Sequence, residues 1–331
     1  MALTKDFKLM HINPALILLF HLDVSEDPEV LSRKVLALSK MESDLIQVLA
    51  DGESKTLAIK HRGRHIQIQI DPLLDENNVP NACIALFRDT TEQDRLEQTR
   101  RDYVSNVSHE LRTPLTAVRG LVEPLSDGIV KKEEDRMRYY GIILQETLRL
   151  SRLIDDMMAL SRLQSGSVSV EPERISSQEL LENISYKYES AMAEKGILFS
   201  IPSLAETNLP ELYNNGDRIE QILVIYLDNA MKFTQPGKNI RVYLKPYKKD
   251  PDRMVFEVED QGSGIDEEEI DRIFDRFYKV DKSRGRTDGT GLGLSIAKEL
   301  SQQMGEEVWA ESSPGQGSSF YLTVKIYKEG M

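Results

Sequence analysis

The chain of 331 residues has very little cysteine and no long hydrophobic run. Its one cysteine, Cys83, allows neither an internal disulfide nor a cysteine-rich zinc site, which fits a reducing compartment. The longest apolar run, residues 14–20, is about a third of what a membrane-spanning helix needs. That run also lacks the charged start and the small-residue cleavage site of a signal peptide. We therefore expect a chain that is soluble and cytoplasmic as given, although the native protein could be longer and carry a membrane anchor.

Acidic residues outnumber basic ones: the chain has 55 Asp and Glu but only 42 Lys and Arg, so its net charge is −13. An acidic chain is a poor candidate for sequence-independent binding of nucleic acid, which needs a basic surface, so we expect no nucleic-acid partner. Hydrophobic residues make up 40% and charged residues 29%, which is ordinary globular composition and excludes wholesale disorder. The length indicates two or three domains.

Residues 1–90 have the texture of a small mixed α/β module. An apolar run at 15–20 predicts a buried strand, and the strict alternation at 65–71 predicts a half-buried one. A turn is expected at 75–78 and a further apolar strand at 82–87. Between the first two strands, the region around 28–49 reads as helix.

Residues 91–166 show almost no strand signal and predict two helices, at 92–127 and 133–163. A hairpin with one apolar stripe on each helix cannot bury both stripes by itself. Pairing with a second copy would form a four-helix bundle, so we expect a homodimer. The alternative is an ordinary helical hairpin packed on its neighbours. The stripe of the second helix has heptad spacing and comprises Ile143, Leu150, Leu153, Met157 and Leu160.

Residues 167–331 alternate between helix and strand patterns, as in an α/β layer domain. Helices are expected at 177–194 and 217–233 and from near Asp266 and Leu292. Strands are expected at 240–247, 254–259, 308–312 and 319–327. With the other two segments, the fold class is a multidomain α+β chain.

Histidine is also scarce, and its placement singles out one residue. The five histidines are His11, His21, His61, His65 and His109, so the third segment contains none. His109 is followed by Glu110, and Thr113 lies one helical turn further along the same face. A carboxylate can orient the ring proton of an imidazole on one nitrogen, which leaves the lone pair of the other nitrogen able to attack. The alternative for an isolated pair is a surface histidine on a helix.

Three glycine clusters in the third segment could approach phosphate oxygens with their backbone amides. They lie at 260–265, 289–294 and 315–318. Taken singly each is only a turn. The chain lacks the P-loop pattern, the dinucleotide-binding glycine pattern, and the His-Arg-Asp and Asp-Phe-Gly motifs. These absences exclude P-loop enzymes, dinucleotide enzymes and eukaryotic-type protein kinases.

The helix end at 226–234 carries groups suited to a metal-bound nucleotide. Asn229 offers an amide oxygen for Mg²⁺, and Lys232 offers a cation for a triphosphate. Further along, Lys282, Arg284 and Arg286 stand in a glycine-containing stretch that reads either as a mobile phosphate lid or as a solvated charged loop.

In their order along the chain, six of these blocks resemble the characteristic boxes of bacterial two-component sensor histidine kinases. The resemblance covers about residues 95–327. More weakly, the first segment, ending in Asp-Thr-Thr-Glu at 89–92, resembles a PAS sensor domain that feeds a signalling helix. The boxes are the H box at 108–114, the N box at 228–234, G1 at 260–264, the F box at 274–278, G2 at 289–294 and G3 at 315–320.

The resemblance implies a phospho-acceptor, His109, with Glu110 as its acid/base partner and Thr113 placing a water for phosphatase action. It implies a Bergerat-type α/β sandwich that binds ATP with Mg²⁺. There Asp260 would bind the adenine amino group, Asn229 the metal, Lys232 a phosphate and Arg276 the γ-phosphate. The remaining ATP-site residues by this resemblance are Phe233, Gly262, Gly264, Ile265, Tyr278, Lys279, Gly289, Thr290, Gly291, Leu292, Gly293 and Leu294.

The family's partner is a response regulator, whose aspartate would receive the phosphoryl group. Two other readings stay open: an ATPase of the Bergerat class without a phosphohistidine, and a non-enzymatic scaffold. Ile225 departs from the family, which usually carries an asparagine there, so ATP affinity or rate could be lower. Glu306 stands where a glycine is common, with little expected effect. His61 and His65 would share a face on one continuous strand, which makes a metal conceivable, but a polar strand face is the favoured reading.

Overall fold

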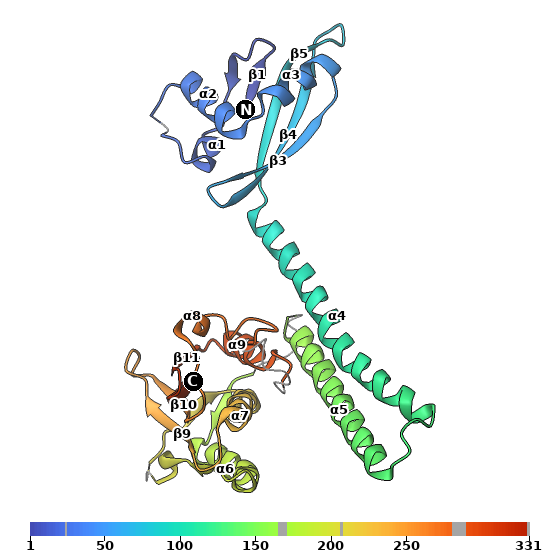
Figure 1. Ribbon diagram of the computed structural model, residues 1–331. Helices are drawn as coiled ribbons and strands as arrows, with labels where there is room; N and C mark the ends of the chain where they lie inside the picture. Colours follow the sequence, from blue (N-terminus) through green and yellow to red (C-terminus); the bar gives the residue numbers. More distant parts are fainter. Residues whose placement is uncertain (24, 165–170, 206–207, 280–288, 330–331) are drawn as a thin grey trace. The chain divides into compact units, whose positions relative to one another are not determined.

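The computed structural model describes the chain apart from residues 24, 165–170, 206–207, 280–288 and 330–331 (Figure 1). It divides into two compact units, Met1–Ser105 and Asn106–Met331, and the division falls inside a long helix. The predicted mixed α+β class is confirmed. No helix among the described residues is long and apolar enough to cross a membrane.

The first unit is built on a five-stranded antiparallel sheet with the strand order β2-β1-β5-β4-β3. The alternation predicted at 65–71 is confirmed, because Ile66, Ile68 and Ile70 of β4 are fully buried while the residues between them are not. Three helices lie between β2 and β3 in the chain. The elements are β1 (Ala2–Thr4), β2 (Leu9–His11), α1 (Pro14–Leu19), α2 (Pro28–Ser39), α3 (Glu42–Asp51), β3 (Lys55–His61), β4 (Arg64–Leu74) and β5 (Pro80–Asp89).

The strand expected at 15–20 is wrong, since α1 occupies this run. Pro14 stands in the first turn, where its fixed φ favours a helix, and the Asn13 side chain accepts a hydrogen bond from the Ala15 N–H at 2.9 Å. Leu16 and Ile17 are buried but Leu18 is 62% exposed, so only one face of the run is covered. Apolar composition alone does not distinguish a short helix from a strand.

The helical stretch expected around 28–49 is confirmed, and it consists of two helices, α2 and α3. Lys40 adopts a left-handed conformation with φ of 55°, which ends α2, and its N–H donates to the Leu36 carbonyl. The chain then restarts as α3, with fully buried Met41 at its N-cap. Lysine is a good helix former, so nothing at position 40 signals the break.

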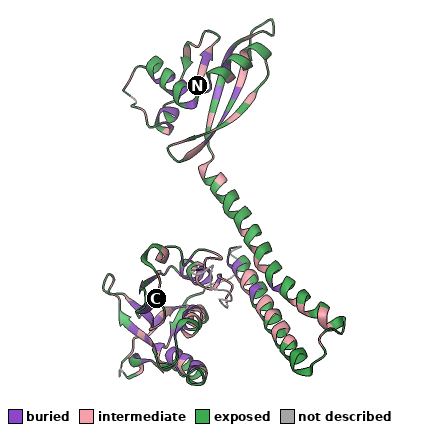
Figure 2. Cartoon of the chain, viewed as in Figure 1, coloured by how far each residue is buried: buried purple, intermediate pink, exposed green. Residues whose placement is uncertain are grey.

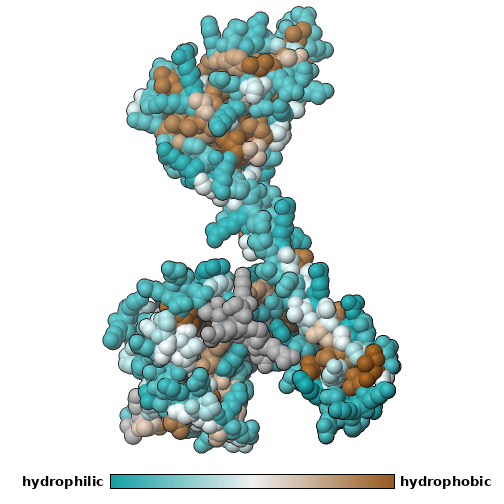
Figure 3. All heavy atoms as spheres, in the orientation of Figure 1, coloured by the Kyte–Doolittle hydropathy of each residue, from teal (hydrophilic) through white to brown (hydrophobic). Residues whose placement is uncertain are grey.

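A helical hairpin links the two units, formed by α4 (Thr91–Ser126) and α5 (Glu133–Gln164). Both predicted helices are confirmed, and α4 continues through Pro114. In the predicted stripe of α5, Leu153 and Leu160 are buried and the other three residues are half-buried. Leu163, outside that stripe, is also buried, and the helix contacts α9. Elsewhere the hairpin leaves large apolar side chains exposed, among them Leu115, Val122, Met137, Leu144 and Leu148. Figure 2 shows that α4 and α5 are largely exposed, and Figure 3 shows hydrophobic surface on the hairpin.

The rest of the second unit has a five-stranded sheet with the order β11-β12-β10-β9-β7, a two-stranded sheet of β6 and β8, and helices. All its neighbours pair antiparallel except β7 and β9. The predicted helices and strands are confirmed here, but the three-residue strands were not foreseen. The elements are β6 (Glu173–Ile175), α6 (Ser177–Glu194), β7 (Leu198–Ser200), a 3-10 turn (Pro202–Ala205), β8 (Leu212–Asn214), α7 (Gly216–Phe233), β9 (Asn239–Pro246), β10 (Arg253–Asp260), α8 (Glu267–Ile270), α9 (Gly293–Gln303), β11 (Val308–Ser313) and β12 (Gly317–Lys325).

The core of this domain lies between the helices and one face of the sheet. Helix α7 presents Ile222, Leu223 and Tyr226 to that core, and all three are fully buried. The hydroxyl of Tyr226 donates to the carbonyl of Tyr321 on β12 at 3.2 Å, so the buried polar atom is paired. This packing fixes the C-terminal end of α7 beside the end of β10.

Candidate functional site

His109 lies on the outer surface of α4 and its side chain is exposed. Thr113, one turn further along, is also exposed, and its hydroxyl donates to the His109 carbonyl oxygen at 3.2 Å. The helical spacing predicted for this pair is therefore present. An exposed imidazole on a rigid helix can be reached by a reactant from solvent.

Glu110 is half-buried between two cations from different parts of the second unit. Its Oε2 atom is 2.7 Å from Lys279 Nζ and 3.8 Å from Arg149 Nη2 on α5. The three side chains are only about one-fifth exposed, so solvent screens these charges less than it would at the surface. The carboxylate next to His109 is thus engaged by a residue predicted to contact ATP.

Asp260 ends β10 in a buried position, with 5% of its surface exposed. Burial raises the pKa of its carboxyl from the ordinary 3.8 to about 6, although the backbone N–H groups of Gly262 and Ser318 favour the charged form. Its Oδ1 atom accepts from the Gly262 N–H at 2.7 Å. A buried carboxyl held in this way is suited to recognise a polar ligand edge.

The first and third glycine clusters pack against each other beside Asp260. A Cβ added at Gly264 would lie 2.0 Å from the Ser313 carbonyl oxygen, and one added at Gly317 would lie 1.9 Å from the Asp260 carbonyl oxygen. Both glycines have positive φ, so only glycine fits sterically and conformationally. Gly264 lets its turn approach Ser313, and Gly317 lets its turn approach Asp260. The resemblance places Gly262 and Gly264 at the ATP site, but the sequence does not indicate that the two clusters pack together.

The second glycine cluster lies just before α9 and against the end of α7. A Cβ on Gly289 would be 2.8 Å from Lys232 Nζ, and one on Gly293 would be 3.3 Å from Ile225 Cγ2. The Phe277 N–H donates to the Gly291 carbonyl at 2.8 Å, which ties the F-box segment to the same cluster. The structure therefore brings Lys232 to this cluster, with half-buried Ile225 packed against it.

Asn229 and Lys232 occupy the last turns of α7, as predicted. Asn229 is half-buried, and the Lys232 ammonium lies 4.6 Å from the centre of the Phe233 ring. Among the described residues no group of three His, Cys, Asp or Glu could hold a metal ion. One amide oxygen suits Mg²⁺ that arrives with phosphate oxygens, because this ion keeps several non-protein ligands. At the C-cap of α7, the hydroxyl of Thr234 is buried and has no hydrogen-bond partner among the described residues.

Arg276 faces helix α9 and the end of α5. Its Nη2 atom is 3.7 Å from Glu299 Oε2, and Nη1 is 2.8 Å from the amide oxygen of Gln164 when that amide is turned toward it. The other predicted ATP-site residues take ordinary structural contacts. The Ile265 N–H donates to Ser312 Oγ, the Tyr278 hydroxyl donates to Glu269, Leu292 is fully buried and Leu294 is half-buried.

Sequence reasoning missed Asp156, on α5. Its Oδ2 atom accepts a hydrogen bond from Thr290 Oγ1 at 2.7 Å, and Thr290 belongs to the second glycine cluster. Burial raises the pKa of the Asp156 carboxyl, against the opposing effects of the Thr290 hydroxyl and Arg152. The two residues are 134 positions apart, so no local pattern signals the contact.

Glu306 is also more engaged than expected. It is 5% exposed, and its carboxylate contacts the Arg253 guanidinium, Thr323 Oγ1 at 2.8 Å and Asn214 Nδ2 at 3.0 Å. Burial raises its pKa, while these partners favour the charged form. These contacts join β8, β10 and β12.

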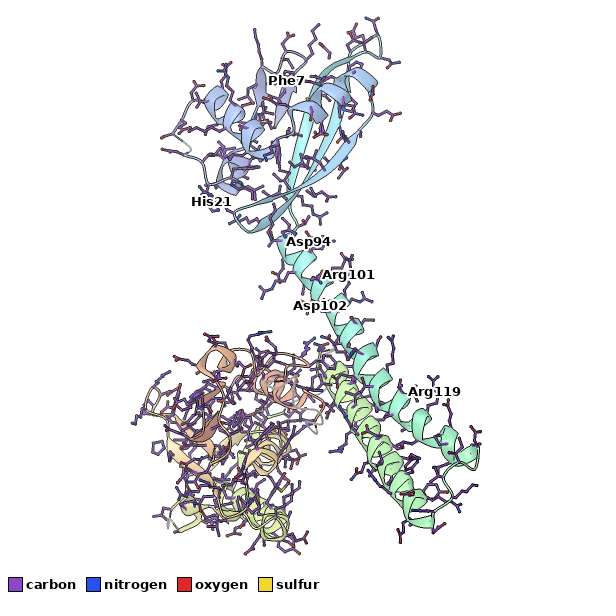
Figure 4. All side chains as sticks on the ribbon, in the orientation of Figure 1. Phe7, His21, Asp94, Arg101, Asp102 and Arg119 are labelled. Carbon is purple, nitrogen blue, oxygen red and sulfur yellow. The ribbon has the colours of Figure 1, made fainter. Side chains whose placement is uncertain are left out.

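His61 and His65 do not lie on one continuous strand, which corrects the sequence-based premise. They flank the β3–β4 turn at Arg62 and Gly63, both of which have positive φ. His65 Nδ1 is 2.9 Å from Asp94 Oδ2 in the first turn of α4, where Figure 4 labels Asp94. The predicted lid residues Lys282, Arg284 and Arg286 lie outside the described residues.

Two family profiles match the chain from residue 99 onward. Residues 99–166 match the His Kinase A (phospho-acceptor) domain, and residues 214–328 match the histidine kinase-, DNA gyrase B-, and HSP90-like ATPase family.

Curated relatives extend the likeness over most of the chain. A sensor protein kinase WalK from Staphylococcus saprophyticus is 32% identical over 303 residues, covering 89% of this chain and 48% of the relative. A WalK from Staphylococcus aureus is 32% identical over 302 residues, covering 89% of this chain and 71% of that one. The chain spans about half the length of the first of these relatives.

Solved structures share the fold. The Acinetobacter baumannii histidine kinase AdeS has a TM-score of 0.53 and 22% identity, covering 66% of this chain and 98% of its own. The histidine kinase ThkA, solved in complex with the response regulator protein TrrA, has a TM-score of 0.54 and 20% identity, covering 100% and 96%. At these identities the likeness concerns the fold alone.

Proposed function

Because the chain belongs to the family of two-component sensor histidine kinases, we propose that it transfers the γ-phosphoryl group of ATP to His109. The observation that carries the proposal is the ion pair between Glu110 and Lys279. It joins the neighbour of the candidate acceptor to the candidate ATP site, across 169 residues of sequence. A Bergerat-class ATPase without a phosphohistidine would not need an H-box residue, Glu110, in contact with its ATP domain.

The proposed reaction is a phosphoryl transfer by positioning and charge neutralisation. A ring nitrogen of His109 attacks the γ-phosphorus, the bond to the bridging oxygen of ATP breaks, and ADP leaves. Glu110 accepts the proton that the imidazole releases. Lys232 and Arg276 neutralise charge on the phosphates, and Asp260 binds the amino group of adenine. Asn229 would hold Mg²⁺ together with the phosphates, and the ion would supply Lewis-acid stabilisation of charge there.

The phosphohistidine would then donate to an aspartate of a response regulator. Thr113, whose hydroxyl shares the His109 face of α4, would place a water to remove the phosphoryl group from that regulator. Support for this partner is the family membership. We assign residues 1–90 to a PAS-like sensor, 91–166 to the phosphotransfer hairpin and 167–331 to the ATP domain.

We also assign a homodimer to the hairpin. Its support is the apolar surface of α4 and α5, much of which stays exposed among the described residues, as at Leu115, Val122, Leu144 and Leu148. Two copies of the hairpin would bury these side chains as a four-helix bundle.

The experiment that tests the function is incorporation of label from γ-labelled ATP with Mg²⁺, comparing the full chain with His109→Gln. Label that is labile in acid, stable in base and lost in the variant supports the proposal. ATP binding and hydrolysis without label on the protein favour the ATPase reading. No nucleotide binding at all favours the non-enzymatic scaffold.

A further inference from the structure

Two carboxylates of the helical hairpin engage residues that the family resemblance places at the ATP site. Asp156 on α5 accepts from the Thr290 hydroxyl at 2.7 Å, and Glu110 on α4 pairs with Lys279 at 2.7 Å. Both partners belong to the ATP domain and both carboxylates come from the phosphotransfer hairpin. An anionic side chain therefore occupies each place where an anionic triphosphate would be expected to bind.

The Thr290 contact lies where a phosphate is favoured electrostatically. Thr290 stands three residues before Gly293, the start of the 11-residue helix α9, and its Oγ1 atom also accepts from the Leu292 N–H at 3.2 Å. Helix N-termini and glycine turns attract anions through their backbone N–H groups. Asp156 supplies one anion at this position, and two anions cannot share it without repulsion.

The surroundings of Asp156 do not look like a site built for stability. The side chain is half-buried, and desolvation outweighs the Thr290 hydroxyl and Arg152 as an influence on its pKa, so the charged form is poorly compensated. A charged group held in a desolvated place with little compensation is costly. A carboxylate retained under these conditions is easy to displace by a ligand with more charge and more contacts.

We propose that Asp156 is a positioning residue whose contact with Thr290 competes with phosphate for this glycine turn, so that ATP binds by displacing it. The same displacement takes Lys279 from Glu110, which frees the carboxylate beside His109 when nucleotide is present. Acid/base assistance at His109 is then coupled to loading of the ATP site. This inference rests on the proposed function and adds the order of events at that site.

The test compares Asp156→Asn with Asp155→Asn in the full chain. Asp155 is the exposed neighbour on the same helix, so both variants remove one negative charge from α5. We expect Asp156→Asn to bind a non-hydrolysable ATP analogue with Mg²⁺ about three- to tenfold more tightly. Asp155→Asn should change the dissociation constant less than twofold. Unchanged or weaker binding by Asp156→Asn, or an equal gain in both variants, overturns the proposal.

A second variant keeps the test decisive if Asp156→Asn unfolds, which circular dichroism would reveal. The double substitution Asp156→Cys with Thr290→Cys should lock the contact when oxidised, and the natural Cys83 is buried. We expect analogue binding to be lost under oxidising conditions and restored by reductant. A disulfide that forms and leaves binding intact overturns the proposal. The ATP analogue transfers no phosphoryl group. These binding measurements therefore test the role of Asp156 whether or not His109 is the phospho-acceptor.

Discussion

Glu110 and Lys279 form an ion pair, with Oε2 and Nζ 2.7 Å apart, although 169 positions separate them in the sequence. Arg149 lies 3.8 Å from the same carboxylate. The residue beside the candidate phospho-acceptor is therefore held by the ATP domain and by the second helix of the hairpin.

Replacing Glu110 with glutamine should slow autophosphorylation strongly. The amide keeps the shape of the side chain but cannot accept the imidazole proton, and general-base assistance is worth about 10²- to 10⁴-fold. We expect a loss of about 100-fold at saturating ATP, with nucleotide affinity retained. Single-turnover kinetics with labelled ATP measure it.

Glu123→Gln is the matched control, because Glu123 is an exposed carboxylate on the same helix, 3.7 Å from Arg119. It should label at the wild-type rate. Equal rates for Glu110→Gln and wild type would remove Glu110 from the mechanism.

Asp260→Asn should make the nucleotide-free chain more stable near neutral pH. The pKa of Asp260 is about 6 in the folded protein and near 3.8 when unfolded, so the folded state binds the proton more tightly. The free energy of unfolding of the wild type therefore decreases as pH rises from about 4 to 6. The asparagine variant has no carboxyl to ionise and does not show this decrease. We expect a gain of about 1–3 kcal/mol at pH 7.5 and a much smaller one at pH 4.

Urea unfolding of both proteins at the two pH values checks this. A stability difference that does not depend on pH would contradict the buried, titrating carboxyl. Weaker nucleotide binding by the stabilised variant would in addition support the assigned contact with adenine.

Gly317→Ala should destabilise the ATP domain by about 3–5 kcal/mol, because the new Cβ would meet the Asp260 carbonyl oxygen at 1.9 Å and φ is +102°. Gly315→Ala, in the same turn, has φ of +75° but nothing within 4 Å of the added Cβ. It should lose only about 1–2 kcal/mol. Thermal melts of the two variants measure the difference, and equal losses would show that the close approach is not rigid.

Leu144→Glu should convert a dimer into a monomer. Leu144 is 61% exposed on α5, and burying a charge in a helical interface is strongly unfavourable. Sedimentation of the wild type should give twice the chain mass of 37.7 kDa. Arg138→Glu, which reverses a charge at an exposed polar position of the same helix, should remain dimeric. A monomeric wild type would contradict the assigned bundle.

Local signals predicted the elements whose ends are marked by side chains. Helix α6 matches its expected range because Ser176 caps it and its apolar residues recur at helical spacing. The sequence did not predict the helix end at Lys40 or the helix at 14–19, because neither a lysine nor an apolar run is a helix-boundary signal. The sequence also did not predict the approach of Gly317 to Asp260 or the Asp156–Thr290 contact, for another reason. They join distant parts of the chain, and only the packed structure brings these together.

The most direct test of the central claim is the intact mass of the full chain after incubation with Mg-ATP. The account predicts one added phosphoryl group on wild type and on His65→Gln, removed by mild acid, and none on His109→Gln. A phosphoryl group that persists on His109→Gln, or that resists acid on wild type, would contradict the assignment of His109 as the acceptor.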